Sequence, residues 1–407
     1  NSSATVTYMT WDAANLYVAI TGASVGEGFV IYIDKDPQVP VNGGSNTNGT
    51  ISGNNYDGTN FTALQFRADL VAYIKNGYRE YRTANGSNGW SSPTTGFGVY
   101  ADNAQFNVNG IREVAIPWSS IGGMPASFNW FAYLTSSAGF VYGNTPVANA
   151  GGSVGTSARY ERYYTVSSTI NTAATKPFSR ESYVFNLAAS NNSFGAISVY
   201  DFTMNSPGLQ ISRGAIGGNW VIAGNLTAAG GSVYFGSGSS SYGTTNVTNI
   251  IINGGTLSMD QTNKALTVSG NCNINSGSFL LSAVSGGDLN IGGNFSNNGT
   301  FTPGNRAITF NGAVPQTISG LLNSGTGPTN ILTNVTIANT TANVTAAADI
   351  NISGGLTVNT NARLDVGTNL LRLNTGSSST INGFLKSANA TGLTVSGTAT
   401  LSFSSTG

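Results

Sequence analysis

Apolar residues in this chain come in short runs, and this feature sets the strongest limit on its fold. In the first half the runs are four or five residues long, rich in β-branched and aromatic side chains, and separated by Gly, Asn and Ser; examples are residues 16–20, 29–33, 70–74 and 113–116. Strands have this length and composition, whereas helices need longer stretches with a 3.6-residue period. The sequence therefore predicts an all-β protein with a β-sandwich in its first half.

The second half carries a recurring phrase, Leu-Thr/Asn-Val/Ile-x-Gly/Asn. Copies begin at Leu266, Leu289, Leu356 and Leu393, the third being looser, so the starts are 23, 67 and 37 residues apart. The first two intervals fit one and three turns of about 22 residues, and the third does not fit. This spacing, with Asn-Gly and Ser-Gly corners, favours a parallel β-solenoid. An antiparallel β-sandwich is the alternative, because Asn-Gly pairs also form hairpins.

Charged residues are few and unevenly divided. They make up 8% of the 407 residues, and 22 of the 32 lie in residues 1–204, together with four of the five tryptophans. The chain is nevertheless 40% hydrophobic, which is enough for a sizeable core in a folded protein. The shift in composition predicts two domains, a sandwich over residues 1–190 and a Gly-, Asn-, Ser- and Thr-rich repetitive region over residues 191–407.

Net charge and the chain start limit partners and location. Sixteen basic and sixteen acidic residues cancel, so we expect no nucleic-acid or anionic membrane partner. No run approaches eighteen apolar residues, so we expect no membrane insertion. Residues 1–5 lack an initiator Met and a charged leader segment, which predicts an extracellular or cell-surface protein whose signal peptide has been removed. Residues 401–407 have the composition of strand and turn, and we expect the natural chain to continue.

The chain has no histidine. This removes the commonest general base and metal ligand, and with them Ser-His-Asp, Cys-His and histidine-zinc sites. The single Cys272 is expected to be a structural thiol. An enzyme would need a carboxylate pair or charges clustered along one solenoid face, yet the acids after residue 204 are only Asp260, Asp288, Asp349 and Asp365. We therefore expect no catalytic activity.

A calcium site is predicted where an apolar strand ends. Asp34 and Asp36 follow that strand directly and begin a long polar loop that reaches Asp57. Carboxylates two residues apart at a strand exit can converge on Ca²⁺ with loop carbonyls and a further acid. The prediction is a site formed by Asp34, Asp36 and Asp57. The alternative is a solvated turn in which Asp34 accepts hydrogen bonds from nearby backbone N–H groups.

A sugar-binding face is predicted where aromatic and charged residues alternate. Tyr78, Tyr81 and Trp90 can stack on the C–H faces of a pyranose, and Glu80 and Arg82 can bind its hydroxyls. Cross-strand salt bridges and half-buried tyrosines with no ligand are the alternative interpretation.

Three segments in order, residues 10–20, 33–37 and 112–118, resemble the family 9 carbohydrate-binding modules and the related DOMON-like sandwiches. The resemblance covers about residues 8–150. It implies a sandwich in which aromatic side chains hold a sugar, here Trp90, and calcium lies at Asp34 and Asp36.

The chain as a whole also resembles large bacterial surface proteins exported by type IX secretion. Residues 66–69, 176–180, 302–312 and 316–320 carry this resemblance. Such proteins usually end in a sorting domain, which is absent from this sequence.

These observations favour an extracellular structural or adhesive protein, in particular a subunit of a surface fibre or filament that self-associates. Low charge supports this expectation, because little repulsion guards exposed strands against pairing. The alternative is a glycan-binding module of a larger secreted protein that binds or processes polysaccharide.

Overall fold

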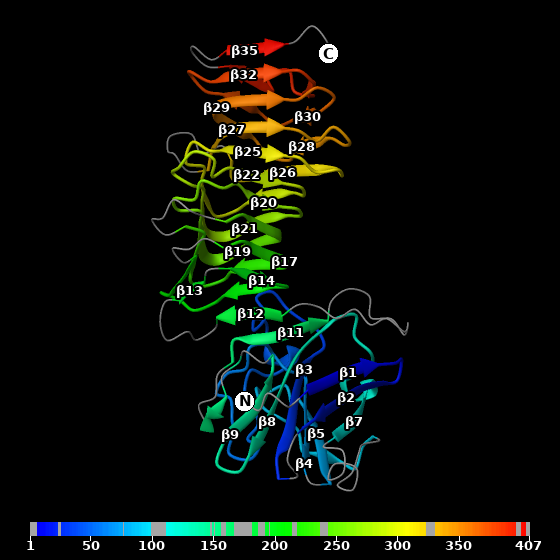
Figure 1. Ribbon diagram of the computed structural model, residues 1–407. Coiled ribbons are helices and arrows are strands. Elements are labelled where there is room, and N and C mark those ends of the chain that lie inside the picture. The colour runs from blue at the N-terminus through cyan, green and yellow to red at the C-terminus, as the bar shows by residue number, and fades with distance from the viewer. Residues whose placement is uncertain are drawn as a thin grey trace. The chain divides into compact units, whose positions relative to one another are not determined.

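The structure, a computed structural model, is all-β, as the sequence predicts. It describes residues 6–22, 26–75, 77–98, 111–146, 149, 151–155, 160–166, 181–185, 192–194, 196–213, 218–236, 243–322, 330–395 and 400–403. The chain divides into two compact units, Asn1–Asn186 and Leu187–Gly407 (Figure 1). The domain boundary expected at residue 190 lies outside the described residues. Helical structure in the described part is limited to two short 3₁₀ segments, Asn46–Asn48 and Trp118–Ile121.

The first unit is a sandwich of two antiparallel sheets. The smaller sheet has the order β1 (Val6–Trp11), β2 (Asn15–Thr21), β7 (Ile111–Pro117). The larger sheet contains β3 (Gly28–Asp34), β4 (Leu70–Lys75), β5 (Tyr78–Thr83), β6 (Thr94–Thr95), β8 (Phe128–Ser136), β9 (Phe140–Thr145), β10 (Gly152–Ser153), β11 (Arg162–Val166) and β12 (Glu181–Phe185). Alternate residues of β2 point inward, as the period of two requires.

The central strands of the larger sheet, β3 and β8, are buried on both faces. On one face Ile31 and Ile33 pack with the inward residues of β2. On the other face Tyr32 stacks on Phe131 with ring centroids 5.0 Å apart, and loop residues such as Phe61 cover them. Every residue of β3 is therefore buried, which explains why this strand is a continuous apolar run.

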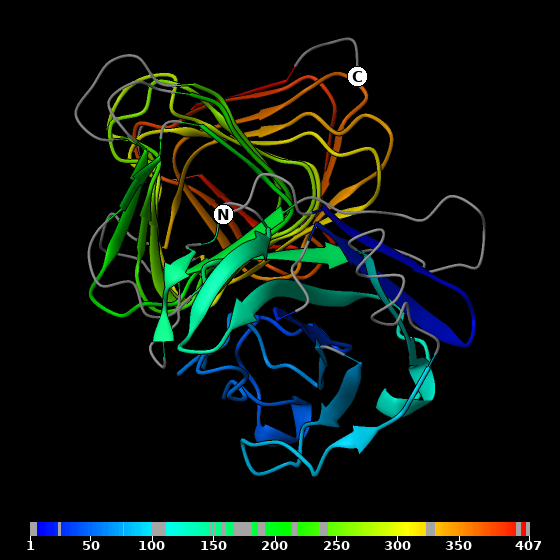
Figure 2. The same cartoon turned by 60° about the horizontal axis from the view of Figure 1, so that its bottom comes forward.

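The second unit is a parallel β-solenoid of about eight turns, so the favoured prediction is confirmed over its sandwich alternative. Figure 1 shows its strands stacked in layers, and Figure 2 shows the successive turns from nearer the end of the stack. Its strands are β13 (Asn192–Phe194), β14 (Ile197–Val199), β15 (Phe202–Met204), β16 (Gln210–Arg213), β17 (Trp220–Ala228), β18 (Ser232–Tyr234), β19 (Thr245–Ser258), β20 (Leu266–Val268), β21 (Cys272–Leu280), β22 (Leu289–Ile291), β23 (Phe295–Asn297), β24 (Thr300–Thr302), β25 (Ala307–Phe310), β26 (Gln316–Gly320), β27 (Leu332–Ile337), β28 (Val344–Ala346), β29 (Ile350–Val358), β30 (Arg363–Asp365), β31 (Leu371–Leu373), β32 (Ser378–Ile381), β33 (Phe384–Lys386), β34 (Leu393–Val395) and β35 (Thr400–Phe403).

The stacking explains the irregular repeat. Leu266, Leu289 and Ile308 lie above one another in one sheet, 23 and 19 residues apart. The same column continues through Val335 to Leu356, three turns after Leu289. Leu393 does not fit because it lies in a different column of stacked residues, the one that contains Ile350 and Leu371.

Asparagine side chains tie successive turns together at one corner of the solenoid. The Oδ1 atom of Asn249 accepts from the backbone N–H of Asn271 (2.9 Å), Asn271 accepts from Asn294 (2.8 Å), and Asn294 accepts from Thr317 (2.8 Å). Each residue lies 22 or 23 positions after the one below it, one turn along the chain. This asparagine ladder satisfies corner N–H groups that face no neighbouring strand.

We expect Asn249→Ala to lower the free energy of unfolding of the solenoid by about 1 to 2 kcal/mol. The substitution removes two contacts, the bond from Asn271 and the bond that Asn249 Nδ2 donates to Asn225 Oδ1 (3.3 Å). Urea denaturation measures the loss. The control is Asn246→Ala at an exposed position of the same strand; an equal loss in that variant would contradict a role for the ladder.

Cys272 occupies an interior position of the solenoid. It is fully buried and lies between Ile250 and Phe295 of the adjacent turns. Burial raises the pKa of its thiol well above the ordinary value. The residue is thus a small apolar core group.

Candidate metal and ligand site

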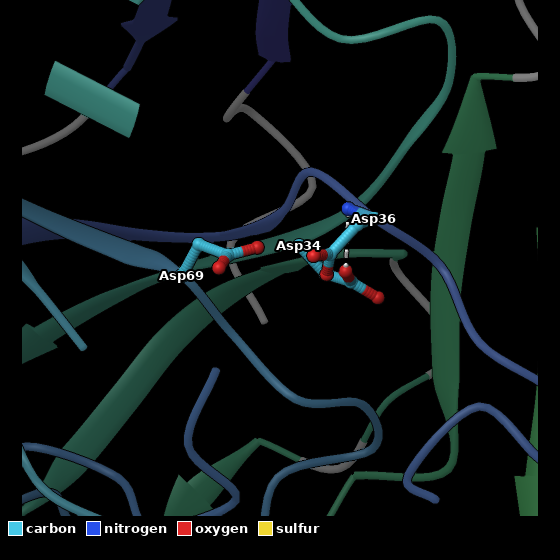
Figure 3. A group of neighbouring side chains, drawn as sticks. All are labelled: Asp34, Asp36 and Asp69. Atoms are coloured by element: carbon cyan, nitrogen blue, oxygen red, sulfur yellow. Dashed lines mark hydrogen bonds between the residues drawn. The ribbon is translucent and has the colours of Figure 1, made fainter. Parts of the chain in front are cut away.

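Three carboxylates come together where strands β3 and β4 meet. Asp34 ends β3, Asp36 follows two residues later, and Asp69 immediately precedes β4. Because β3 and β4 are antiparallel with Ile33 opposite Leu70, the end of one strand lies beside the start of the other. One oxygen from each carboxylate lies within 4.8 Å of the other two (Figure 3). We call this group the acidic cluster.

The third acid differs from the one expected. Asp57 does not join Asp34 and Asp36; it accepts hydrogen bonds from Lys75 Nζ (2.7 Å) and Tyr73 Oη (3.0 Å), near the other end of β4. Asp69 takes its place. The sequence predicts strands at residues 29–33 and 70–74, and antiparallel pairing of these two strands is what places Asp69 beside Asp34.

Hydrogen bonds fix the buried members of the acidic cluster. Asp34 accepts from Asn129 Nδ2 (3.0 Å) on β8 and from the backbone N–H of Asp36 (3.1 Å). Asp69 accepts from the backbone N–H of Lys35 (2.7 Å). Asp34 is fully buried, whereas Asp36 is exposed. The cluster is therefore reachable from solvent on one side.

The electrostatics of the acidic cluster favour an added positive charge. Burial raises the pKa of Asp34 well above its ordinary value, and the negative charge of Asp69 raises it further. Burial raises the pKa of Asp69 to about 6. Both shifts mean that the ionised carboxylates are costly here. A proton or a hard divalent cation bound by oxygen ligands would relieve that cost, and the donor set fits Ca²⁺.

A cavity of about 400 Å³ adjoins the acidic cluster. Asp69 and Lys35 line it, together with residues from three loops at 46–49, 83–86 and 120–122. Lys35 Nζ donates to the carbonyl of Ile121 (2.9 Å), which fixes the lysine along the wall. The volume lies in the range of small-molecule sites, about 300 to 1,000 Å³. Asp69 thus belongs both to the acidic cluster and to the wall of a ligand-sized hollow.

The predicted sugar-binding residues fall into separate places. Tyr78, Glu80 and Arg82 share one face of β5, and Glu80 accepts from Tyr78 Oη (2.6 Å), Arg82 Nε (2.9 Å) and Tyr56 Oη (2.8 Å). Burial raises the pKa of Glu80, but the hydrogen bonds from Arg82 and the two tyrosines outweigh it, so the pKa lies below the ordinary value. Glu80 is therefore a buried anion held by its neighbours.

The other two predicted residues lie elsewhere. Tyr81 points to the opposite face of β5 and packs edge-on against Phe97, with centroids 4.9 Å apart. Trp90 donates its indole N–H to the carbonyl of Ser52 (2.9 Å), and its ring lies 5.8 Å from that of Tyr32. The structure therefore places Trp90, half-buried, against the apolar cluster that Tyr32, Phe61 and Phe131 form on one face of the larger sheet. Sugar binding by these residues stays a prediction.

Three carboxylates of the solenoid accept hydrogen bonds from backbone N–H groups of the next turn. Asp201 accepts from the N–H of Asn225 (2.6 Å), Asp288 from Ala307 (2.9 Å) and Asp349 from Leu370 (2.9 Å), in each case one turn later. Asp365 pairs with Lys386 of the next turn (2.8 Å). These acids act in the same way as the asparagine ladder, holding one turn to the next.

Fold and site together define a two-unit all-β protein, an antiparallel sandwich with an acidic cluster joined to a parallel β-solenoid. No family model matches the chain, and no curated protein or solved structure is detectably similar to it. Within the described ranges, no helix has the length and apolar character needed to cross a bilayer.

Proposed function

We propose that this is an extracellular structural or adhesive protein whose solenoid is a stiff framework, built to associate into surface fibres. The observation that carries the proposal is the continuous bonding from turn to turn, through the asparagine ladder and through Asp201, Asp288 and Asp349. Each turn adds about 4.8 Å along the axis and contacts only its neighbours. The carboxylates of Asp201, Asp288 and Asp349 are thereby engaged in holding successive turns together.

Imaging and hydrodynamics test the proposal. Protein isolated from the surface of its native cells should appear in negative stain as fibres or higher-order particles, and the purified chain should associate with rising concentration in size-exclusion chromatography. Dispersed monomers in both measurements, over a wide concentration range, would contradict a structural role through assembly.

A second function, calcium-dependent ligand binding, is favoured by the sharing of Asp69 between the acidic cluster and the cavity. A cation at the cluster would lie at the wall of the hollow. Ligand hydroxyls could then complete its coordination, since Ca²⁺ takes six to eight oxygen ligands. Polysaccharide is the ligand class implied by the resemblance to carbohydrate-binding modules.

Calcium titration checks this second function. We expect the metal-free chain to bind Ca²⁺ in isothermal titration calorimetry, and Asp69→Asn to weaken binding by at least about tenfold, because it removes one anionic ligand. Asp57→Asn is the matched control, since Asp57 lies outside the acidic cluster, and should bind as the wild type does. Equal weakening in both variants would rule out the proposed site.

Glycan binding is tested separately. Binding of the chain to a polysaccharide on a glycan array should be lost on chelation of Ca²⁺ and in Asp69→Asn. Loss in Trp90→Ala with no calcium dependence would instead support the face predicted around Trp90. An array with no bound glycan would exclude both.

A further inference from the structure

Strand β1 forms an edge of the smaller sheet of the sandwich. Within the described residues it pairs with β2 alone, through a continuous register from Val6 opposite Thr21 to Trp11 opposite Leu16. Val6 and Tyr8 alternate on its outer face and are 47% and 56% exposed. An edge strand of six residues with exposed apolar side chains is a template for a further strand.

The edge at β1 lacks the protection that other marginal strands of the unit carry. Its sequence, Val-Thr-Tyr-Met-Thr-Trp, contains no charge, no proline and no glycine. At the other margin, β7 has Arg112 pointing inward, Glu113 exposed outside and Pro117 at its end. Strands β6 and β10 are only two residues long. Inward charges, proline and short strands all hinder edge pairing, so among these margins, within the described part of the unit, β1 is the one left open to it.

The backbone of β1 is arranged for pairing. Asp12 N–H donates to Asn15 O (3.0 Å) at the end of the hairpin. Hydrogen-bonded and non-hydrogen-bonded pairs alternate along an antiparallel ladder, so the backbone groups of Tyr8 and Thr10 face β2. Those of Thr7 and Met9 consequently point away from β2, toward the open side.

We propose that β1 pairs antiparallel with β1 of a second copy of this chain, joining two smaller sheets into one across a two-fold axis at Tyr8. This inference rests on the proposed function and names one surface through which two copies associate. A second copy fits because an uncharged strand meets no repulsion from its own copy. In this register Thr7 bonds Met9 of the partner copy and Tyr8 faces its own equivalent, where side chains approach most closely.

The geometry also defines what the contact builds. A two-fold contact uses the same patch on both chains and closes after two copies. Pairing at β1 therefore produces a dimer, and growth of a fibre would use a different surface. Strand addition of this kind draws its affinity from main-chain hydrogen bonds.

Cysteine cross-linking tests the register, because the chain's own Cys272 is buried. Under mild oxidation Tyr8→Cys should give a disulfide-linked dimer, and an equimolar mixture of Val6→Cys and Thr10→Cys should give a mixed one. The matched control is Val39→Cys, at a loop position of similar exposure, 48%. It should give little dimer.

A charge test complements the cross-link. Tyr8→Lys places like charges opposite each other across the axis and should raise the dimer dissociation constant at least tenfold in sedimentation velocity, while Val39→Lys leaves it unchanged. Wild-type-like association of Tyr8→Lys, or no more cross-linking at Tyr8 than at Val39, overturns the β1 contact even if fibres form. A wild-type chain that stays monomeric and forms no fibres overturns the proposed structural role as well.

Discussion

Replacing Trp220 by alanine is expected to lower the free energy of unfolding of the solenoid by about 3 to 5 kcal/mol. Trp220 is fully buried in β17, and its ring contacts Phe202 and Phe235 with centroids 5.8 and 5.6 Å away. The guanidinium carbon of Arg213, itself fully buried, lies 5.2 Å from the ring centroid. The substitution leaves a large cavity and removes the aromatic neighbour of a buried cation. The expected loss of unfolding free energy is therefore large for a single substitution.

The same unit offers a matched control. Phe384 also lies against a guanidinium, with Arg363 5.2 Å from its centroid, but it is 47% exposed. Phe384→Ala should cost no more than about 1 kcal/mol, since cation–π contacts at exposed sites are weak and no cavity forms. Urea denaturation followed by circular dichroism measures both variants. A similar loss of unfolding free energy in the two variants would contradict the view that burial of Trp220 between turns stabilises the solenoid.

Asp69→Asn is expected to change how the stability of the sandwich depends on pH. Burial raises the pKa of Asp69 to about 6 in the folded state, whereas a carboxyl in the unfolded chain titrates near 4. The folded state therefore holds this proton more tightly. The resulting stabilisation is complete below pH 4, is lost as the pH rises through 6, and amounts to about 2 to 3 kcal/mol.

The isosteric amide cannot ionise, so the variant lacks this loss. In calcium-free buffer, the difference in unfolding free energy between Asp69→Asn and the wild type should shift in favour of the variant between pH 4 and pH 7. Glu113→Gln, which alters an exposed acid of the same unit, is the control and should follow the wild-type profile. If the unfolding free energies of Asp69→Asn and the wild type change in parallel with pH, burial does not destabilise the ionised form of Asp69.

Calcium should reverse the advantage of the Asp69→Asn variant. A bound cation supplies the positive charge that the buried carboxylates of the wild type lack, so saturating Ca²⁺ at pH 7 should stabilise the wild type more than the variant. If Ca²⁺ leaves the wild-type profile unchanged, the acidic cluster is a buried proton-binding site and holds no metal.

Local patterns were sufficient for the strands. The apolar runs at 29–33 and 70–74 lie inside β3 and β4, and the phrase at Leu266 and Leu289 marks successive turns. Side chains alternate along a strand, so Tyr81 and Glu80 must point to opposite faces of β5. The predicted sugar-binding face placed both on one side, although this alternation follows from the sequence alone. These features depend on near neighbours in the chain, which is why the sequence reveals them.

Contacts between segments that are distant in the chain do not follow from local sequence patterns. Asp57 is nearer to Asp34 in the chain than Asp69 is, yet Asp69 joins the acidic cluster because β4 returns antiparallel beside β3. Leu393 matches the repeated phrase, yet it stacks in a different column from Leu356, because an interval in sequence does not distinguish a complete turn from a turn plus a corner.

The sequence by itself determined the all-β class and the change of character between the two halves, because strand length, side-chain alternation and Gly or Asn corners act within a few residues. It favoured a solenoid in the second half, and the parallel strand pairing of the tertiary structure excluded the sandwich alternative. The tertiary structure alone decided which carboxylates meet, which side of β5 each aromatic occupies and which edge strand stays open. Strand pairing sets these, and a pairing is a choice among many partners whose energies depend on the whole packed sheet.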